Sequence, residues 1–211
     1  MCNRFDRHGF FPKEKVDGKS IYQQCLARAE ESPIFSKDVN GKGAKTFFAC
    51  GYEQFCNTHY KYTPRKHVYE LINPDLPCKI YLDFDEKDTS QKEAFEQNTS
   101  TFVDHALSKL PSGSTHHIMV SDNPRKLSKH VIINVFLKDL ETVKAFVNQC
   151  HDSVRCPSLD LNVYTPFRSF RLLYSSKWGA DPSTALRIEG NDSYDPELLL
   201  DTLIQAFDKT K

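Results

Sequence analysis

The sequence predicts an α+β fold in an ordinary globular protein. Its 211 residues include 39% hydrophobic and 12% aromatic side chains, enough to bury a sizeable core as one domain or as two closely packed lobes. Segments with helical periodicity and segments with strand-like patterns follow one another along the chain. The middle of the chain has the pattern of a strand, a helix and then two strands in succession.

An N-terminal αβ lobe is expected over about residues 1–66. The segment Ser20–Glu31 predicts an amphipathic helix with a serine N-cap. A turn-rich, charged connector is expected over Lys37–Lys45. The apolar run Thr46–Cys50 then predicts a strand, and the aromatic-rich segment Tyr52–Tyr60 predicts a second helix.

A central module is expected over about residues 67–190. It begins with two predicted strands, His67–Ile72 and Cys78–Phe84, which a proline-containing turn separates. Ser90 and Glu93 have the spacing of a capping box, so a long helix is predicted from there to Leu110. Strands at 117–121 and 128–137 follow.

The remaining predicted elements complete the module and the C-terminus. Asp139 is expected to cap a helix that runs to Cys150. Three further strand candidates are Leu159–Tyr164, Phe170–Tyr174 and Ala185–Ile188. The segment 191–211 is expected to hold a C-terminal helix that starts at Pro196 and packs on the sheet through its leucines.

Composition limits the classes of partner and the compartment. Lysine plus arginine and aspartate plus glutamate number 28 each, so the whole molecule has no net field that attracts a polyanion. Contact with nucleic acid therefore requires local basic patches. Seven cysteines, an odd number, and the lack of an apolar signal region lead us to expect a reduced, intracellular and soluble protein with no membrane partner.

Two groups of cysteine and histidine residues have spacings that could suit zinc ligands. Cys50, Cys56 and His59 form one, and Cys150, His151 and Cys156 form the other, but neither contains a CxxC pair. We therefore expect free buried thiols.

Asp83 and Asp85 are the first candidates for a functional site. They lie two apart at the end of an apolar strand, so both carboxylates leave the same face, roughly 6.6 Å apart along the backbone. Hard oxygen ligands of this kind suit Mg²⁺ or Mn²⁺, two of which can support an in-line phosphoryl displacement. The pair could equally be a solvated strand end. Asp160, in an apolar run of its own, is the natural third ligand or else a helix or turn cap.

A basic and hydroxyl-bearing group follows in the second half. Ser128 and His130 share one face of a strand, and Lys126 has the same parity. Arg171 lies between apolar neighbours, which indicates that it points inward, and Lys177 follows. Residues 121–180 hold nine lysines or arginines against five acids, a net charge of +4, so an anion site is expected. Lys129 and Arg168 could simply be solvated.

Three stretches in order, YELINPDLPCKIYLDFD, RKLSKHVIIN and LDLNVYTPFRSFRLLYSSKWG, resemble the signature motifs of the archaeo-eukaryotic primase superfamily. The likeness is to the eukaryotic and viral primase-polymerases called PrimPol and to herpesvirus-type primases, and it covers about residues 47–179. It implies an αβ lobe packed on an RRM-like lobe, with the active site in the cleft between two mixed sheets. The whole chain would then be one catalytic core.

The resemblance also implies residue roles. Asp83, Asp85 and Asp160 match the catalytic metal ligands for Mg²⁺ or Mn²⁺. The residues that match nucleotide-binding positions are Lys126, Ser128, His130, Arg171, Lys177 and Tyr69. Of these, His130, Arg171 and Lys177 would stabilise charge, and Tyr69 would lie near the nucleotide sugar.

Some positions depart from the family pattern. Asp85 stands where PrimPol-like relatives usually have glutamate, and Ser169 stands where they often have asparagine. The Cys/His zinc module that follows the core in these relatives is missing from this sequence, so extension of a primer is a firmer expectation than unaided priming.

The expected function is template-directed nucleotide addition by a DNA primase or polymerase in DNA replication and damage tolerance. Its partners would be a DNA template and primer, NTP or dNTP substrates, and a zinc-module domain, a helicase or a single-strand-binding protein. Location in the nucleus, a mitochondrion or a viral replication site fits equally. A noncatalytic RRM-like nucleic-acid-binding protein and a two-metal nuclease are the alternatives.

Overall fold

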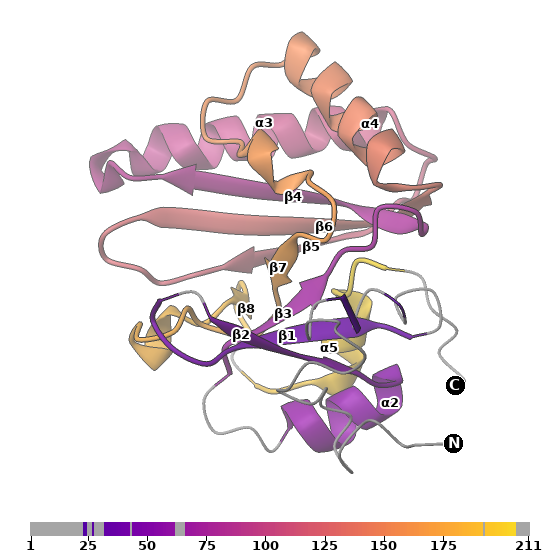
Figure 1. The fold of residues 1–211 in the computed structure, drawn as a ribbon. Coiled ribbons are helices and arrows are strands. Elements are labelled where there is room, and N and C mark those ends of the chain that lie inside the picture. Colours follow the sequence, from indigo (N-terminus) through magenta and orange to yellow (C-terminus); the bar gives the residue numbers. More distant parts are fainter. Residues whose placement is uncertain are drawn as a thin grey trace, which may run out of the picture.

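The computed structural model describes residues 23–24, 27, 32–42, 44–61, 66–191 and 193–205. The described strands form two four-stranded sheets, and helices accompany both (Figure 1). The predicted α+β class is therefore confirmed. Every strand pair is antiparallel, so the expectation of two mixed sheets is wrong.

The first sheet has the strand order β2-β1-β3-β7. Its strands are β1 (Ile34–Asp38), β2 (Lys45–Ala49), β3 (Val68–Leu71) and β7 (Ser169–Arg171). A short helical segment lies against this sheet, formed by the α-helical turn α2 (Tyr52–Gln54) and the π-helix Phe55–Tyr60 that continues it. The rings of Phe35 and Phe55 stack at 3.7 Å between centroids, which fixes that segment on the sheet.

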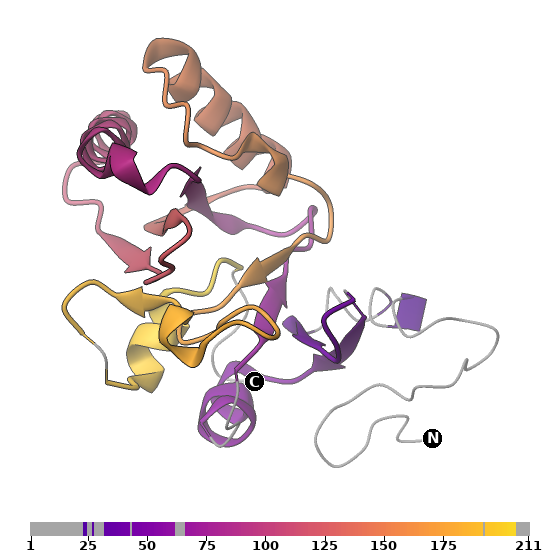
Figure 2. The same cartoon turned by 90° about the vertical axis from the view of Figure 1, so that its left-hand side faces the viewer.

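The second sheet has the order β4-β6-β5-β8. Its strands are β4 (Cys78–Glu86), β5 (His116–Val120), β6 (Leu127–Leu137) and β8 (Arg187–Ile188). Two helices, α3 (Lys92–Ser108) and α4 (Leu140–Ser153), lie side by side along it, away from the first sheet (Figures 1 and 2). Phe84 of β4 meets Phe102 of α3 edge to face, at 5.9 Å.

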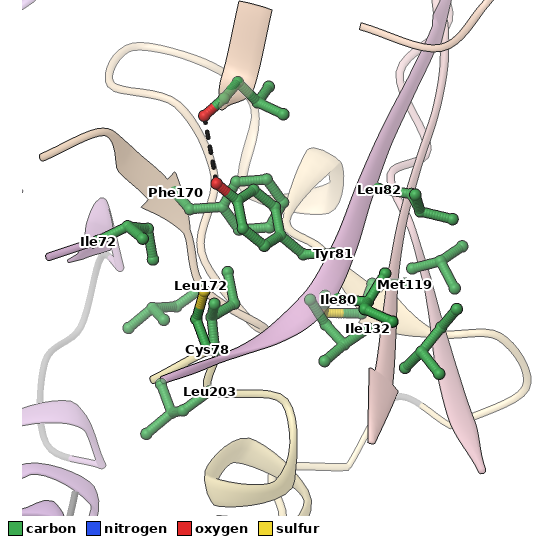
Figure 3. Close-up of a cluster of buried hydrophobic side chains, with 14 of the residues drawn as sticks. Ile72, Cys78, Ile80, Tyr81, Leu82, Met119, Ile132, Phe170, Leu172 and Leu203 are labelled. Carbon is green, nitrogen blue, oxygen red and sulfur yellow. Dashed lines mark hydrogen bonds between the residues drawn. The ribbon is translucent and has the colours of Figure 1, made fainter. Parts of the chain in front are cut away.

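Strand β4 is buried on both of its faces, which explains its nearly continuous apolar sequence. Ile80, Leu82 and Phe84 alternate with the residues that face the first sheet. On that other face, the ring of Tyr81 packs edge-on against Phe170 of β7 at 4.9 Å (Figure 3). Apolar contact between Tyr81 and Phe170 therefore joins the two sheets.

The two long helices begin differently. Asp139 accepts a hydrogen bond from the backbone N–H of Thr142, so the predicted cap of α4 is confirmed. The predicted capping box at Ser90 is wrong. Asp88 instead accepts from Ser90 and caps a 3₁₀ turn, Thr89–Gln91, which leads into α3. Asp88 precedes the helix by one more turn, which the S-x-x-E pattern does not reveal.

The N-terminal third agrees with the prediction only in part. Most of the predicted helix Ser20–Glu31 lies outside the described residues, and Gln23 and Gln24 within it are helical. Strand β1 begins before the expected connector Lys37–Lys45 and extends into it. Strand β3 pairs with β1, so the first sheet draws strands from both sides of the boundary expected near residue 66.

The C-terminal third departs further. The predicted strand Leu159–Tyr164 is wrong, because only Leu159 bridges to β4, opposite Phe84, and Leu161–Val163 forms a 3₁₀ turn. The C-terminal helix does start at Pro196, but α5 (Pro196–Asp201) is only six residues long. After α5 the chain runs extended to Gln205, which bridges to Cys78.

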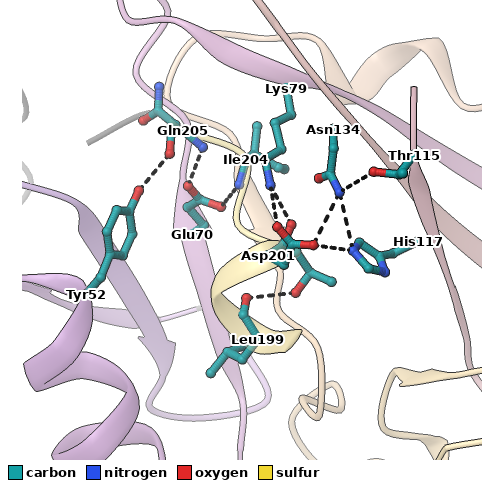
Figure 4. A network of polar contacts seen from close by, with 11 residues as sticks. Tyr52, Glu70, Lys79, Thr115, His117, Asn134, Leu199, Asp201, Ile204 and Gln205 are labelled. Atoms are coloured by element: carbon teal, nitrogen blue, oxygen red, sulfur yellow. Dashed lines mark hydrogen bonds and ion pairs between the residues drawn. The ribbon is translucent and has the colours of Figure 1, made fainter. Parts of the chain in front are cut away.

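A buried polar network ties this C-terminal segment to both sheets (Figure 4). Glu70 of β3 accepts hydrogen bonds from the backbone N–H groups of Ile204 and Gln205, at 2.8 and 2.9 Å. Asp201 bonds to His117 of β5 at 2.6 Å, in the other sheet. Residues 201–205 therefore act as a strap across the two sheets.

The described cysteines are free and buried: Cys50, Cys56, Cys78, Cys150 and Cys156. Burial raises the pKa of the Cys50 and Cys56 thiols to about 12. For these five the expectation of buried thiols is confirmed, while Cys2, Cys25 and the side chain of His59 lie outside the description. In the part of the chain that the structure describes, no helix has the length and apolar character needed to cross a bilayer.

The strap gives a pH prediction. Burial raises the pKa of Glu70 from an ordinary 4.5 to about 7, and the N–H groups of Ile204 and Gln205 only partly oppose it. The folded state therefore holds the proton more tightly than the unfolded state. Its contribution to the free energy of unfolding is full below pH 4.5 and is lost as the pH rises to about 7.

Urea unfolding at a series of pH values checks this prediction. Glu70→Gln resembles the protonated side chain and cannot titrate, so its stability relative to wild type should rise between pH 4.5 and 7. The exposed Glu197→Gln on α5 serves as control and should follow wild type. Parallel curves for wild type and Glu70→Gln would show that Glu70 does not titrate in this window.

Candidate functional site

A cavity of about 160 Å³ lies between the two sheets. The predicted acids Asp83 and Asp85 line it. So do all the predicted nucleotide-binding residues: Tyr69, Lys126, Ser128, His130, Arg171 and Lys177. The structure therefore brings together residues that are more than 100 positions apart in the sequence.

Strand register places the acids opposite the second motif. In the antiparallel pairing of β4 with β6, Asp83 lies directly across from His130, and Asp85 lies directly across from Ser128. Directly opposed residues point to the same face of a sheet, here the face toward the cavity. The two-residue spacing in each strand therefore places four polar side chains next to one another on one face of the sheet.

One oxygen of each of the two carboxylates lacks a hydrogen-bond donor in the described part of the chain. Within the described residues, Oδ1 of Asp83 and Oδ1 of Asp85 are buried and have no hydrogen-bond partner. Burial raises the pKa of Asp83 to about 7, and the charge of Asp85 adds to the effect. A lysine partly offsets this, because Nζ of Lys126 forms an ion pair with Oδ2 of Asp85. The Oδ1 atoms of the two acids are thus placed to accept a cation that the described residues do not supply at that point.

Asp160 lies next to the acid pair, and one of its carboxylate oxygens caps a turn. Its backbone N–H donates to the carbonyl of Asp83 at 2.8 Å, so the two residues are neighbours. However, Oδ1 of Asp160 accepts from the backbone and side-chain nitrogens of Asn162 and caps the 3₁₀ turn. Asp160 does not line the cavity wall with the other predicted residues.

The donor set fits a divalent cation at the acid pair. Over the described residues, no three His, Cys, Asp or Glu side chains converge as a ready metal site. Two buried carboxylate oxygens without donors nevertheless match the hard oxygen ligands of Mg²⁺ or Mn²⁺. They belong to residues two apart on the face of β4 that lines the cavity. Asp83 and Asp85 would hold such an ion, and Asp160 would need to turn away from Asn162 to join them.

His130 is neutral in this environment. Burial lowers the pKa of its imidazole well below the ordinary value, and the charges of Arg171, Lys177 and Lys126 lower it further. Its Nε2 lies 3.4 Å from Oδ1 of Asp83, which for a neutral ring is no ion pair. His130 can therefore offer a ligand a hydrogen bond from a neutral ring.

The first sheet supplies the opposite wall. Arg171 of β7 pairs in register with Tyr69 of β3, and it is only 9% exposed. The expectation that its side chain points inward agrees with its place in the cavity wall. Strand β7 is bracketed by Phe167 and Tyr174, two non-glycine residues with positive φ of 54° and 64°. Such backbone costs about 1 kcal/mol or more per residue and is typical of functional sites.

The cavity carries a surplus of positive charge. Lys126, Arg168, Arg171 and Lys177 face two carboxylates across it. Burial lowers the pKa of Lys177, and the neighbouring charges of Lys126 and Arg171 add to this effect. A bound anion would reduce the repulsion among these cationic side chains. Lys129 differs: it is buried on the opposite face of β6 and pairs with Glu96 of α3, so it is neither solvated nor part of the site.

Sequence reasoning missed several residues around the cavity. Phe170 lines it, as does Ser169, which the resemblance had marked as a departure from the family pattern. Asp38 and Lys45, from a hairpin expected to be a connector, contact Tyr69. Trp178 follows Lys177 and is 44% exposed, which is unusual for so large an aromatic side chain. The adjacency of Lys177 and Trp178 in the sequence was the one available signal.

A wider groove of about 650 Å³ adjoins the cavity and shares Lys126 and Ser128 with it. The start of α3, the turn between β5 and β6, and β8 form its walls. The cavity therefore has a neighbouring channel large enough for an extended ligand.

Comparison with known proteins gives no family for this arrangement. No protein-family model matches the chain, and no curated protein matches it closely enough to count as a relative.

Proposed function

We propose that this protein is a template-directed nucleotidyltransferase, a DNA primase or polymerase that adds nucleotides by metal-assisted phosphoryl transfer. One observation carries the proposal: two carboxylates, each with one buried oxygen that has no hydrogen-bond partner among the described residues, line a single cavity with a cluster of cationic side chains. A nucleoside triphosphate with its metal ions has this same distribution of charge, with anionic oxygens next to divalent cations.

The cationic side chains would hold the triphosphate. Arg171 offers a planar fork of donors from a buried position, and Lys126 and Lys177 offer point charges. Ser128 and the neutral His130 add hydrogen-bond donors to phosphate oxygens. The 3′-hydroxyl of a primer would then form a bond to the α-phosphate as the bond to the leaving pyrophosphate breaks.

Asp83 and Asp85 would hold the divalent cations on the other side of the triphosphate. When bound, such ions lower the pKa of the attacking hydroxyl and neutralise charge on the phosphates. Lys126 neutralises Asp85 in the structure as described. With Asp85 engaged as a metal ligand, Lys126 would be free to contact the phosphates, so both ends of the ion pair would have new partners.

The strand order supports the RRM-like arrangement implied by the resemblance. The chain passes through β4, α3, β5, β6 and α4 in turn, and β4 lies next to β6. Leu159 bridges to the free side of β4, opposite Phe84, where the last strand of an RRM-like sheet would lie. A shortened final strand would thus leave room for Asp160 beside Asp83.

Template and primer would use surfaces next to the cavity. The adjoining groove is open and contains both lysines and acids. Trp178 offers an exposed ring that a base could stack on, worth about 1–3 kcal/mol per base.

Primer extension with Mg²⁺ or Mn²⁺ and with rNTPs or dNTPs tests the proposal. The variant Asp83→Ala/Asp85→Ala should lose at least about 100-fold in rate, because these two are the acids among the described residues that line the cavity. Asp88→Asn, an exposed acid just beyond the same strand, should extend primers as wild type does. Strand cleavage without nucleotide binding would instead select the nuclease, and nucleic-acid binding that is insensitive to the acids would select the noncatalytic protein.

The triphosphate role of Lys177 gives a second prediction. Lys177→Met should weaken nucleotide binding by about 10- to 100-fold, the effect of losing one charge-assisted contact. Titration calorimetry with a nonhydrolysable nucleoside triphosphate measures this directly. Lys138→Met, on an exposed side chain far from the cavity, is the matched control. Equal affinities for both variants would remove Lys177 from the site.

A further inference from the structure

Tyr69 is held at the cavity wall by a partly buried ion pair from the β1–β2 hairpin. Its hydroxyl donates to Oδ2 of Asp38 at 2.7 Å. The other oxygen of Asp38 accepts from Nζ of Lys45 at 2.6 Å. The same ammonium group lies 3.4 Å from the centre of the Tyr69 ring, which adds a cation–π contact. The phenol is therefore fixed at its oxygen and over its face.

Strand register explains why these three residues meet. Asp38 and Lys45 are directly opposed in the β1–β2 pair. Tyr69 lies opposite Ser36 in the β1–β3 pair, and Ser36 is two residues from Asp38 on the same face. Three adjacent strands thus form one polar cluster that reaches the cavity through Tyr69, although none of its members adjoins another in the sequence.

The cluster decides which way the hydroxyl of Tyr69 can bond. A phenol has one proton, and here the carboxylate of Asp38 takes it. The phenol keeps that proton, since burial and then Asp38 raise the pKa of Tyr69. What the oxygen has left for the cavity is lone pairs. A ligand group that meets Tyr69 must therefore be a donor.

Only part of a nucleotide can supply that donor. Phosphate oxygens of a metal-bound triphosphate accept hydrogen bonds, and they match Arg171, which lies directly across from Tyr69 in the sheet. The donors of a nucleoside triphosphate are the hydroxyls of its sugar and the amino groups of its base. Next to a phosphate-binding arginine, the sugar is the nearer of the two.

We propose that Asp38 and Lys45 are positioning residues that make Tyr69 an obligate hydrogen-bond acceptor for a sugar hydroxyl, and so set which sugars the site accepts. The inference rests on the proposed function, because it takes the ligand to be a nucleoside triphosphate. A site that must receive a hydroxyl proton penalises a sugar that lacks that hydroxyl, because a buried acceptor is then left unpaired.

Asp38→Asn tests the polarity without removing the ring. Lys45 donates to the amide oxygen of the new side chain, which turns the amide NH₂ toward Tyr69. The phenol oxygen then accepts from that NH₂ group and points its proton into the cavity. A sugar hydroxyl would then have to accept from the phenol instead of donating to it, a geometry for which the wild-type site is not arranged, so the selectivity between sugars should fall by about 10-fold. Tyr69→Phe, which removes the hydroxyl, should abolish the same selectivity.

The measurement is the affinity and the kcat/KM for ATP, dATP and dideoxy-ATP on one template. In wild type, the hydroxyl whose removal lowers affinity and kcat/KM the most is the group that bonds to Tyr69. The decrease caused by removing that hydroxyl should be smaller in Asp38→Asn and in Tyr69→Phe. Asp201→Asn removes a carboxylate that pairs with Lys79 away from the cavity, and it should leave the three-sugar ratios unchanged. Thermal unfolding checks that each variant folds.

The outcomes separate the two proposals. If wild type binds and incorporates nucleotides but Asp38→Asn changes all three sugars by the same factor, the role of Asp38 is structural and the inference fails alone. If wild type binds none of the three nucleotides, the proposed function and this inference fail together. If it binds them without incorporating them, the catalytic proposal fails, and the affinity ratios still decide whether Asp38 controls Tyr69.

Discussion

The antiparallel pairing of β4 with β6 is the constraint on which the site depends. It sets Asp83 against His130 and Asp85 against Ser128 through backbone hydrogen bonds, before any side chain makes a contact of its own. The contact between Tyr81 and Phe170 then holds the first sheet close enough for Arg171 to line the same cavity as these acids. Chemistry at the cavity thus follows from sheet register and apolar packing.

The cavity holds charged and polar groups of both signs, and several of them have no hydrogen-bond partner in the described protein. Oδ1 atoms of Asp83 and Asp85 are buried without donors among the described residues, and His130 stays neutral because it is buried and cations surround it. The close ion pair between Lys126 and Asp85 is partly open to solvent and can be exchanged for other partners. A site arranged only for stability would satisfy such groups internally. The unsatisfied groups are what a ligand of mixed charge would complete.

The sequence was sufficient for elements with long periodic patterns and insufficient for short ones. Helices α3 and α4 and strands β4 and β6 were predicted, because each carries enough apolar positions to define a face. Strand β1 was missed, since five residues with a serine and two charges look like a loop until β2 and β3 pair with both edges. Leu159–Tyr164 looked like a strand, yet Asp160 and Asn162 form a local cap that competes with pairing.

The same limit applies to the site. Residues that a motif specifies, such as Ser128 and Arg171, could be named because their spacing and apolar neighbours are visible in the sequence. Asp38 and Lys45 could not, because their relation to Tyr69 exists only through cross-strand pairing. The contact of Asp160 with Asn162 agrees with the turn cap that was the alternative to a metal ligand, whereas its position beside Asp83 arises only from the fold.

The β5–β6 hairpin has a consequence for how this protein can diverge. Side-chain orientation in β6 has a period of two, so deleting Val131, directly after His130, would send the serine and the imidazole to the helix side. The turn at 122–125 lies outside that pairing and can gain or lose residues while the cavity wall is preserved. Natural length variation should therefore collect in this turn, and spacing within the strand should be kept.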